Sequence, residues 1–345
     1  MKIPRALLNT SILLTPLLSL CTFAQDRLTV YCSATNALCE STTRTFAQKY
    51  QVDVSFIRLS TGSTLAKIDA EKKNPRADIW YGGTFDPHSQ AGEMGLLMSY
   101  RSPELVHIQE KFKDPARRKG HYSSAIYIGI LGFGINKQRL EEKQLDTPLC
   151  WKDLTKPALR DEIQIADTQS SGTAYTALTT FIQLWGEEQA FEYLKELDRN
   201  ISQYTKSGFT PSRNLARGDI TVGIGFLHDY VLEQSKGAQL ELVLPCEGTG
   251  YEIGGVSIIK GARNIENAKK FVDYVLSKQG QENIWKLGNT FQTLTNVNAQ
   301  QSPKAYDPEK INLVDYDMQI FGSTKERKRL ITKWVNTIKM SQAQR

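Results

Sequence analysis

Residues 28–36 read Leu-Thr-Val-Tyr-Cys-Ser-Ala-Thr-Asn, a short apolar run that leads into a cluster of small polar residues. A stretch with helical spacing follows, and the same order recurs at three more clusters, residues 60–64, 81–84 and 170–173. Small hydroxyl residues and glycine in this position predict a helix N-terminus at each cluster, although any one of them is also typical of an ordinary cap or turn. Helix N-termini attract anions, so four together predict a protein that closes around a phosphate or a similar oxyanion.

Strand-like runs alternate with helical stretches along the chain. Runs at residues 28–31, 52–57 and 78–81 are each followed by helical spacing, and so are the runs at residues 163–166 and 220–226. This alternation predicts an α/β fold with mainly parallel sheets, whose parallel strands are joined by right-handed crossovers.

Two lobes are predicted from the order of these elements. The chain would cross between them near residue 129 and return near residue 252, so lobe 1 would comprise residues 25–128 and 253–345, and lobe 2 residues 129–252. A chain of 345 residues is long enough for two domains of about 100–200 residues each. The ligand is expected in the cleft between the lobes, where hinge strands permit closure.

Residues 1–24 have the pattern of a secretory signal peptide. Lys2 and Arg5 precede an apolar run over residues 12–20, and small residues stand before an expected cut after Ala24. We therefore expect a free protein that is exported across the inner membrane to the periplasm.

Composition and missing motifs exclude several functions. The chain has 43 basic and 37 acidic residues, a net charge of +6 that is scattered, so nucleic acid is not expected as a partner. No nucleophile elbow, phosphate-binding P-loop, dinucleotide fingerprint or zinc-protease helix occurs. Adjacent His228 and Asp229 would point to different sides of most backbones, which suits two ligand contacts better than a catalytic pair. We expect no enzyme, no cofactor and no metal, and a solvated helix face for the basic tail, residues 325–345.

Four cysteines follow the signal peptide, an even number that predicts two disulfides in an exported protein. Cys32 with Cys39 would close a local loop, and Cys150 would then pair with Cys246. Spacing alone leaves the other two connectivities open, and no cysteine spacing matches a usual zinc site.

A family resemblance is carried by several short segments spread over nearly the whole chain after the signal peptide. They are residues 28–31, Arg76-Ala77-Asp78-Ile79-Trp80-Tyr81, Ser171-Gly172-Thr173, Ala216-Arg217-Gly218-Asp219, Asn267-Ala268-Lys269-Lys270-Phe271 and Leu276-Ser277-Lys278-Gln279-Gly280-Gln281. With these, the chain resembles periplasmic solute-binding proteins of ABC importers, in the branch that binds ferric ions, phosphonates and sugar phosphates. The resemblance implies the type II two-lobed fold and delivery of a ligand to an inner-membrane ABC permease with its ATPase. We expect a monomer.

The ferric ligands of that family are missing here. Ferric-binding members have a histidine in the first loop, a glutamate in the third cluster and two adjacent tyrosines near residue 225. This chain has Cys32-Ser33-Ala34-Thr35, Gly82-Gly83-Thr84 and Leu227-His228-Asp229-Tyr230 at these places. A lone Tyr230 does not supply the phenolate and carboxylate oxygens that ferric iron prefers, which argues against iron.

Hexose-phosphate-binding members of the family use a His-Asp pair and a downstream glutamate for the sugar hydroxyls. The resemblance therefore implies His228, Asp229 and Glu252 as sugar ligands, and an ionised carboxylate can accept hydrogen bonds from two vicinal hydroxyls. The clusters would hold the phosphate through neutral donors and helix dipoles, without any arginine. The residues assigned to it are Thr35, Asn36, Thr61, Gly62, Ser63, Gly83, Thr84, Ser171, Gly172 and Thr173, with Ser207 and Arg213 as additional contacts.

The predicted ligand is thus a hexose 6-phosphate, such as glucose 6-phosphate or fructose 6-phosphate. Asp229 and Glu252 could instead hold an ammonium group, so 2-aminoethylphosphonate or another small phosphorylated solute is the alternative.

Overall fold

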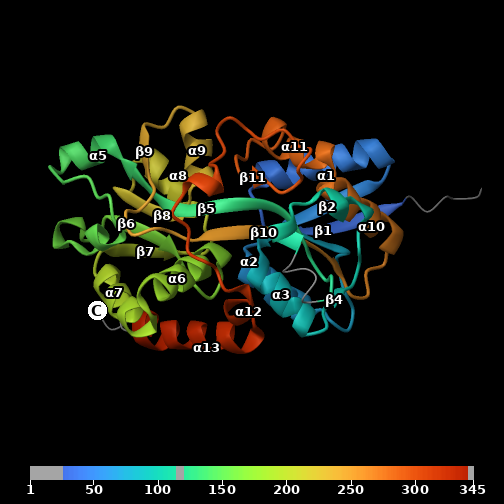
Figure 1. Ribbon diagram of the computed structural model, residues 1–345, viewed down its shortest axis with the longest axis horizontal. Helices are drawn as coiled ribbons and strands as arrows, with labels where there is room; N and C mark the ends of the chain where they lie inside the picture. Colours follow the sequence, from blue (N-terminus) through green and yellow to red (C-terminus); the bar gives the residue numbers. More distant parts are fainter. Residues whose placement is uncertain (1–25, 114–119, 341–345) are drawn as a thin grey trace, which may run out of the picture.

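Two long strands, β5 (Ser124–Asn136) and β10 (Tyr251–Ile259), join the two sides of the molecule (Figure 1). They pair antiparallel, and their register places Glu252 opposite Gly129. The two positions at which the sequence predicts the crossings therefore face each other. The structure is a computed structural model that describes residues 26–113 and 120–340, so the predicted signal peptide lies outside the described residues.

The remaining strands are short. They are β1 (Arg27–Cys32), β2 (Asp53–Arg58), β3 (Ile79–Thr84), β4 (Leu97–Met98), β6 (Ile163–Ala166), β7 (Ile201–Thr205), β8 (Val222–Phe226), β9 (Leu240–Val243) and β11 (Thr293–Leu294).

Each side of the molecule has its own parallel group of strands. On one side β1 lies between β2 and β3 in parallel pairing, and β3 pairs antiparallel with β10. On the other side β6 lies between β7 and β8 in parallel pairing, and β8 pairs antiparallel with β5. The short strands β4, β9 and β11 add antiparallel pairs to β10 or β5. This confirms the predicted α/β class, with mainly parallel groups joined by two connecting strands.

Helices flank both groups (Figure 1). The α-helices are α1 (Asn36–Tyr50), α2 (Thr61–Ala70), α3 (Phe85–Glu93), α5 (Lys137–Glu142), α6 (Gly172–Trp185), α7 (Glu187–Asp198), α8 (Thr210–Arg217), α9 (Leu227–Ser235), α10 (Ile265–Leu276), α11 (Lys278–Lys286), α12 (Met318–Phe321) and α13 (Thr324–Trp334). Shorter helical turns are η1 (Pro103–His107), η2 (Trp151–Thr155), η3 (Pro157–Leu159), η4 (Pro308–Lys310) and η5 (Val335–Lys339).

Two main apolar cores correspond to the two sides. The first packs β1, β3 and β10 against α1 and α10, where Phe46 meets Phe271 edge to face with ring centroids 5.0 Å apart. The second packs the far half of β5, β6 and β8 against α6 and α7, around Phe133 and Phe181. Burial of aromatic and branched side chains is the main stabilising contribution in each core.

The C-terminal segment packs with the second core. Leu330 and Trp334 are buried there, and Arg329 pairs with Glu187 at the start of α7. The predicted lobe boundaries remain a prediction, and this packing indicates that the end of the chain belongs with lobe 2 instead of lobe 1. The expectation of a solvated helix holds for one face of α13 only, because Arg327 is buried on the other face.

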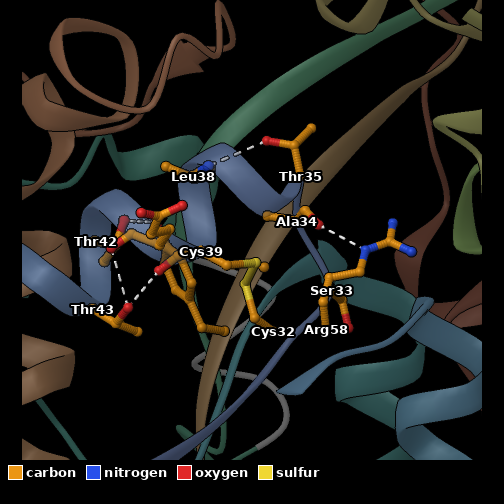
Figure 2. The surroundings of a disulfide bond; sticks show 12 residues. Cys32, Ser33, Ala34, Thr35, Leu38, Cys39, Thr42, Thr43 and Arg58 are labelled. Carbon is orange, nitrogen blue, oxygen red and sulfur yellow. Dashed lines mark hydrogen bonds between the residues drawn. A yellow bond between two sulfur atoms is a disulfide. The ribbon is translucent and has the colours of Figure 1, made fainter. Parts of the chain in front are cut away.

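Two disulfides, Cys32–Cys39 and Cys150–Cys246, confirm the predicted connectivity. The first ties the end of β1 to the first turns of α1 (Figure 2). Within the described ranges, no helix combines the length and apolar character needed to cross a bilayer.

Candidate ligand-binding site

One cavity is lined by residues from both sides of the molecule. The space among its lining atoms is about 470 Å³ when the part open to solvent is counted. The predicted site residues that line it are Thr35, Thr61, Gly83, Thr84, Ser171, Thr173, Ser207, His228, Asp229 and Glu252.

The four helices that follow the predicted clusters all begin at this cavity. The N-cap residues of α1, α2, α3 and α6 are Thr35, Ser60, Thr84 and Ser171, and all four line it. The backbone N–H groups of a first helical turn have no partner within the helix, so these termini can donate to an anion. The structure thus brings together the four clusters that the sequence analysis identified.

The hydroxyl groups of these caps are used differently. Thr35 and Ser171 each cap their own helix, accepting from the N–H of Leu38 and of Ala174 at 3.4 Å. The Thr84 side chain makes no capping bond, and its Oγ1 is buried without a hydrogen-bond partner among the described residues. Thr84 is therefore the cap residue whose hydroxyl is most available to a ligand.

Five predicted phosphate contacts do not line the cavity, and their role in binding stays a prediction. Asn36 and Arg213 are exposed, and the Ser63 hydroxyl lies 2.9 Å from that of Ser60. Gly62 and Gly172 lie where the two sides touch.

Glycine is needed at these two contacts because a side chain would not fit. A Cβ on Gly62 would lie 2.6 Å from the carbonyl oxygen of Gln169, and one on Gly172 would lie 2.2 Å from Thr84 Oγ1. The Gly62 N–H also donates to the carbonyl of Ser170 at 3.0 Å. These glycines permit the close approach of the two sides.

His228, Asp229 and Glu252 form a second set of residues that line the cavity. His228 and Asp229 lie in the first turn of α9, and Glu252 projects from β10. The His228 Nε2 atom is 3.5 Å from Asp229 Oδ1 and 3.9 Å from Glu252 Oε1. The expectation that His228 and Asp229 point to different sides is wrong: both side chains line the same cavity. Gly129 makes room for them, since a Cβ there would lie 2.7 Å from Glu252 Oε1.

Burial changes the ionisation of all three groups. It raises the pKa of Asp229 to about 7, although the positive charge of Arg58 opposes this rise. Burial, reinforced by the negative charge of Asp229, raises the pKa of Glu252 well above its usual value. Burial lowers the pKa of His228 to about 3, so the imidazole is neutral near pH 7. Asp229 and Glu252 are therefore two carboxyl groups that lack enough polar partners to ionise easily.

Arg58, at the end of β2, also lines the cavity and was missed by the sequence analysis. Its Nε donates to the carbonyl of Ala34 at 3.1 Å, as Figure 2 shows, and its guanidinium donates to the Ser207 hydroxyl on the other side at 2.8 Å. It is the single lysine or arginine among the lining residues that the structure describes. A basic residue two positions before the second cluster was the available signal, whereas the sequence analysis proposed Arg213 as the arginine contact.

Gln292 was missed because no motif marks it. Its side-chain amide lies 3.2 Å from His228 Nε2, while Gln292 Oε1 and His228 Nδ1 are buried without partners among the described residues. Buried polar atoms nearly always have a hydrogen-bond partner. Together with Thr84 Oγ1, these atoms indicate that a polar ligand completes the site.

Comparison with known proteins places the chain among binding proteins. The model of the family described as bacterial extracellular solute-binding protein matches residues 74–319. The periplasmic binding protein AfuA of Actinobacillus pleuropneumoniae, solved with exogenous fructose 6-phosphate bound, is 64% identical with a TM-score of 0.90, covering 92% of this chain and 99% of that one.

Two further relatives are similar to most of this chain. The solved periplasmic binding protein P5PA is 51% identical with a TM-score of 0.88, covering 91% of this chain and 100% of that chain. An uncharacterized protein of Haemophilus influenzae is 62% identical over 319 residues, which is 92% of each chain.

Proposed function

This chain belongs to the bacterial extracellular solute-binding proteins, and we propose that its ligand is a hexose 6-phosphate such as fructose 6-phosphate or glucose 6-phosphate. Proteins of this kind are periplasmic receptors of ABC transport and are not enzymes. The solved relative AfuA holds fructose 6-phosphate. We extend that ligand class to this chain because the geometry of the cavity supports it.

The observation that carries the proposal is the chemical contrast between two sets of residues that line the cavity. The first set comprises the N-termini of α1, α2, α3 and α6, with Arg58 beside them. Such donors suit a phosphate dianion. The second set, Asp229 and Glu252 with neutral His228, suits the vicinal hydroxyls of a sugar.

Ligand contacts from both sides would also favour the closed arrangement. Arg58 and the first three helix N-termini belong to the side of β1–β3, whereas α6 and α9 belong to the side of β6–β8. A ligand shifts a conformational equilibrium only through contacts that it makes better in one state. A hexose phosphate that contacts both sides would therefore favour closure, and we propose delivery of the closed complex to an inner-membrane permease.

An aminoalkylphosphonate is the competing ligand, because two buried carboxyl groups can hold an ammonium group as well as hydroxyls. The test has two parts. Native mass spectrometry of protein purified from its periplasm would identify a retained ligand, and calorimetric titration would compare fructose 6-phosphate, glucose 6-phosphate and 2-aminoethylphosphonate. We expect a retained hexose phosphate mass and binding of at least one sugar phosphate. Binding of the phosphonate alone would contradict the proposal.

The route to the periplasm is part of the same proposal. Cleavage after Ala24 would release a chain that begins at Gln25. The intact mass of the exported protein measures this directly.

A further inference from the structure

The Gly82–Gly83 peptide is held from both of its ends. Both glycines have positive φ, +76° and +80°, so the chain turns here in a conformation that other residues rarely adopt. The Gly82 carbonyl lies 3.1 Å from His88 Nε2, and the Gly83 N–H donates to the Tyr127 hydroxyl at 3.1 Å. The C=O and N–H of a trans peptide point in opposite directions, so His88 and Tyr127 clamp one peptide group between them.

The hydrogen bonds around His88 define its tautomer. A carbonyl only accepts, so Nε2 must carry the proton that it donates to Gly82. Nδ1 then accepts from the Ser257 hydroxyl at 2.7 Å, and Ser257 in turn accepts from Ser123 at 2.7 Å. The ring also stacks on Trp80 with centroids 3.8 Å apart. Burial lowers the pKa of His88 to about 3, in agreement with a neutral ring that has one fixed proton.

The clamp decides which way the Tyr127 hydroxyl donates. Its oxygen accepts from Gly83, and among the described residues no acceptor for its own proton is found. Tyr127 lines the cavity, so that proton is available to an acceptor oxygen of a ligand. Burial and the nearby charge of Glu252 raise the pKa of Tyr127 well above its usual value, so the hydroxyl keeps its proton.

Gly83 itself is less able to serve a ligand than the sequence implied. Its N–H was expected to contact the phosphate, but this donor is already used on Tyr127. Gly83 instead permits a close approach, since a Cβ there would lie 2.5 Å from Thr61 Oγ1. Within the site proposed above for a hexose phosphate, we infer that Tyr127 is a ligand-binding donor and that His88 is a positioning residue that orients it through the Gly82–Gly83 peptide.

The first test compares Tyr127→Phe with wild type by calorimetric titration with fructose 6-phosphate. Loss of one neutral hydrogen bond is expected to weaken binding about 3- to 10-fold. Tyr81→Phe is the matched control, because Tyr81 lies buried in β3, bonds to Thr42 and does not line the cavity. We expect the control to bind like wild type. Wild-type affinity of Tyr127→Phe would overturn the inference.

The second test asks whether His88 acts through Tyr127. His88→Phe keeps an aromatic ring against Trp80 but removes the donor to Gly82, whereas His88→Gln keeps a side-chain N–H that can reach the same carbonyl. We expect His88→Phe to weaken binding about 2- to 5-fold, His88→Gln to recover most of it, and the double variant with Tyr127→Phe to bind no more weakly than Tyr127→Phe alone. Additive losses in affinity would overturn the positioning role.

These results separate the inference from the proposed function. A wild-type protein that binds no hexose phosphate contradicts the proposed function. Normal binding by wild type, strong loss in Asp229→Asn and no loss in Tyr127→Phe contradicts the inference alone. If Tyr127→Phe does not fold, the two His88 variants decide. Equal affinity of His88→Phe and His88→Gln for fructose 6-phosphate would then contradict the inference.

Discussion

Two sets of residues that line the cavity bind by different physical means. At the N-termini of α1, α2, α3 and α6, most donors are neutral backbone and hydroxyl groups, with the Arg58 guanidinium beside them, and Thr84 Oγ1 is ready without a change of charge. In the second set, Asp229 and Glu252 are buried carboxyl groups whose pKa values are raised. Each neutral donor contributes a small share of the binding free energy, whereas each buried carboxylate contributes much and depends on its neighbours. Substitutions in the two sets should therefore differ strongly in effect.

The largest effect is expected from Asp229→Asn. The variant keeps the size of the side chain but loses an ionised acceptor and adds N–H donors, so affinity for fructose 6-phosphate should fall about 10- to 100-fold, measured by calorimetry. Glu233→Gln is the control: Glu233 lies one turn further along α9, pairs with Lys236 and does not line the cavity. Equal losses of affinity from both substitutions would show that the charge on α9 governs binding and that direct contact with Asp229 does not.

Arg58→Gln should have the second-largest effect. The guanidinium lies beside the helix N-termini and also opposes the raised pKa of Asp229, so its charge acts on both sets of lining residues. We expect about a 10- to 30-fold loss in affinity for fructose 6-phosphate, because one charge-assisted interaction is removed. Arg58→Lys keeps the charge but not the planar group, and should recover part of the loss. Full affinity in Arg58→Gln would mean that neutral donors suffice, as the sequence analysis expected.

The free energy of unfolding of the ligand-free protein and its affinity for the sugar should change with pH in opposite directions. The pKa of Asp229 is about 7 in the folded chain and about 3.9 in an unfolded chain. Its contribution to the free energy of unfolding is therefore present below about pH 4 and is lost as the pH rises to about 7. Affinity for a sugar that needs the carboxylate should rise over the same interval, by up to the roughly 10- to 100-fold that we expect Asp229→Asn to lose.

Thermal unfolding and calorimetry between about pH 5 and 8 check this prediction. Asp229→Asn is the comparison, since it keeps the ionisation of the ligand phosphate and removes that of the side chain. A rise in affinity that is the same in wild type and Asp229→Asn would assign it to the phosphate instead.

The smallest effect is expected from Thr84→Val. Removing one neutral hydroxyl among several donors should cost about 0.5–1.5 kcal/mol, or about 2- to 10-fold in affinity. Thr43→Val is the matched control, because the Thr43 hydroxyl is buried and donates to a carbonyl within α1, away from the cavity. A loss of affinity as large as that of Asp229→Asn would contradict the distinction between the neutral donors and the buried carboxyl groups.

Much of the fold could be predicted from the sequence because its signals are local. Strand, cluster and helix follow one another in order, and the family segments and even cysteine number agree with the structure. The short strand β7 and the packing of α13 were not foreseen, since neither has a distinctive local pattern. Their placement depends on which apolar surface remains to be covered.

The residues of the candidate site also fall into those with a local sequence signal and those without one. Cap residues such as Thr84 could be located because a helix N-terminus needs a particular kind of residue just before it. Tyr127 and Gln292 could not, because one comes from a connecting strand and the other from a loop that only the folded chain brings to the cavity. Arg58 could have been found from its place two positions before the second cluster.

The sequence by itself determined the α/β order, the four helix N-termini and the absence of the ferric ligand set. The first two follow from residue type and near-neighbour spacing, which act over a few residues, and the third follows from the family resemblance. The tertiary structure alone decided that β5 and β10 pair with Gly129 opposite Glu252, that burial raises the pKa of Asp229, and that Gly83 donates to Tyr127 instead of remaining free. Burial and hydrogen-bond partners depend on groups far apart along the chain, and their distances exist only once the chain has folded.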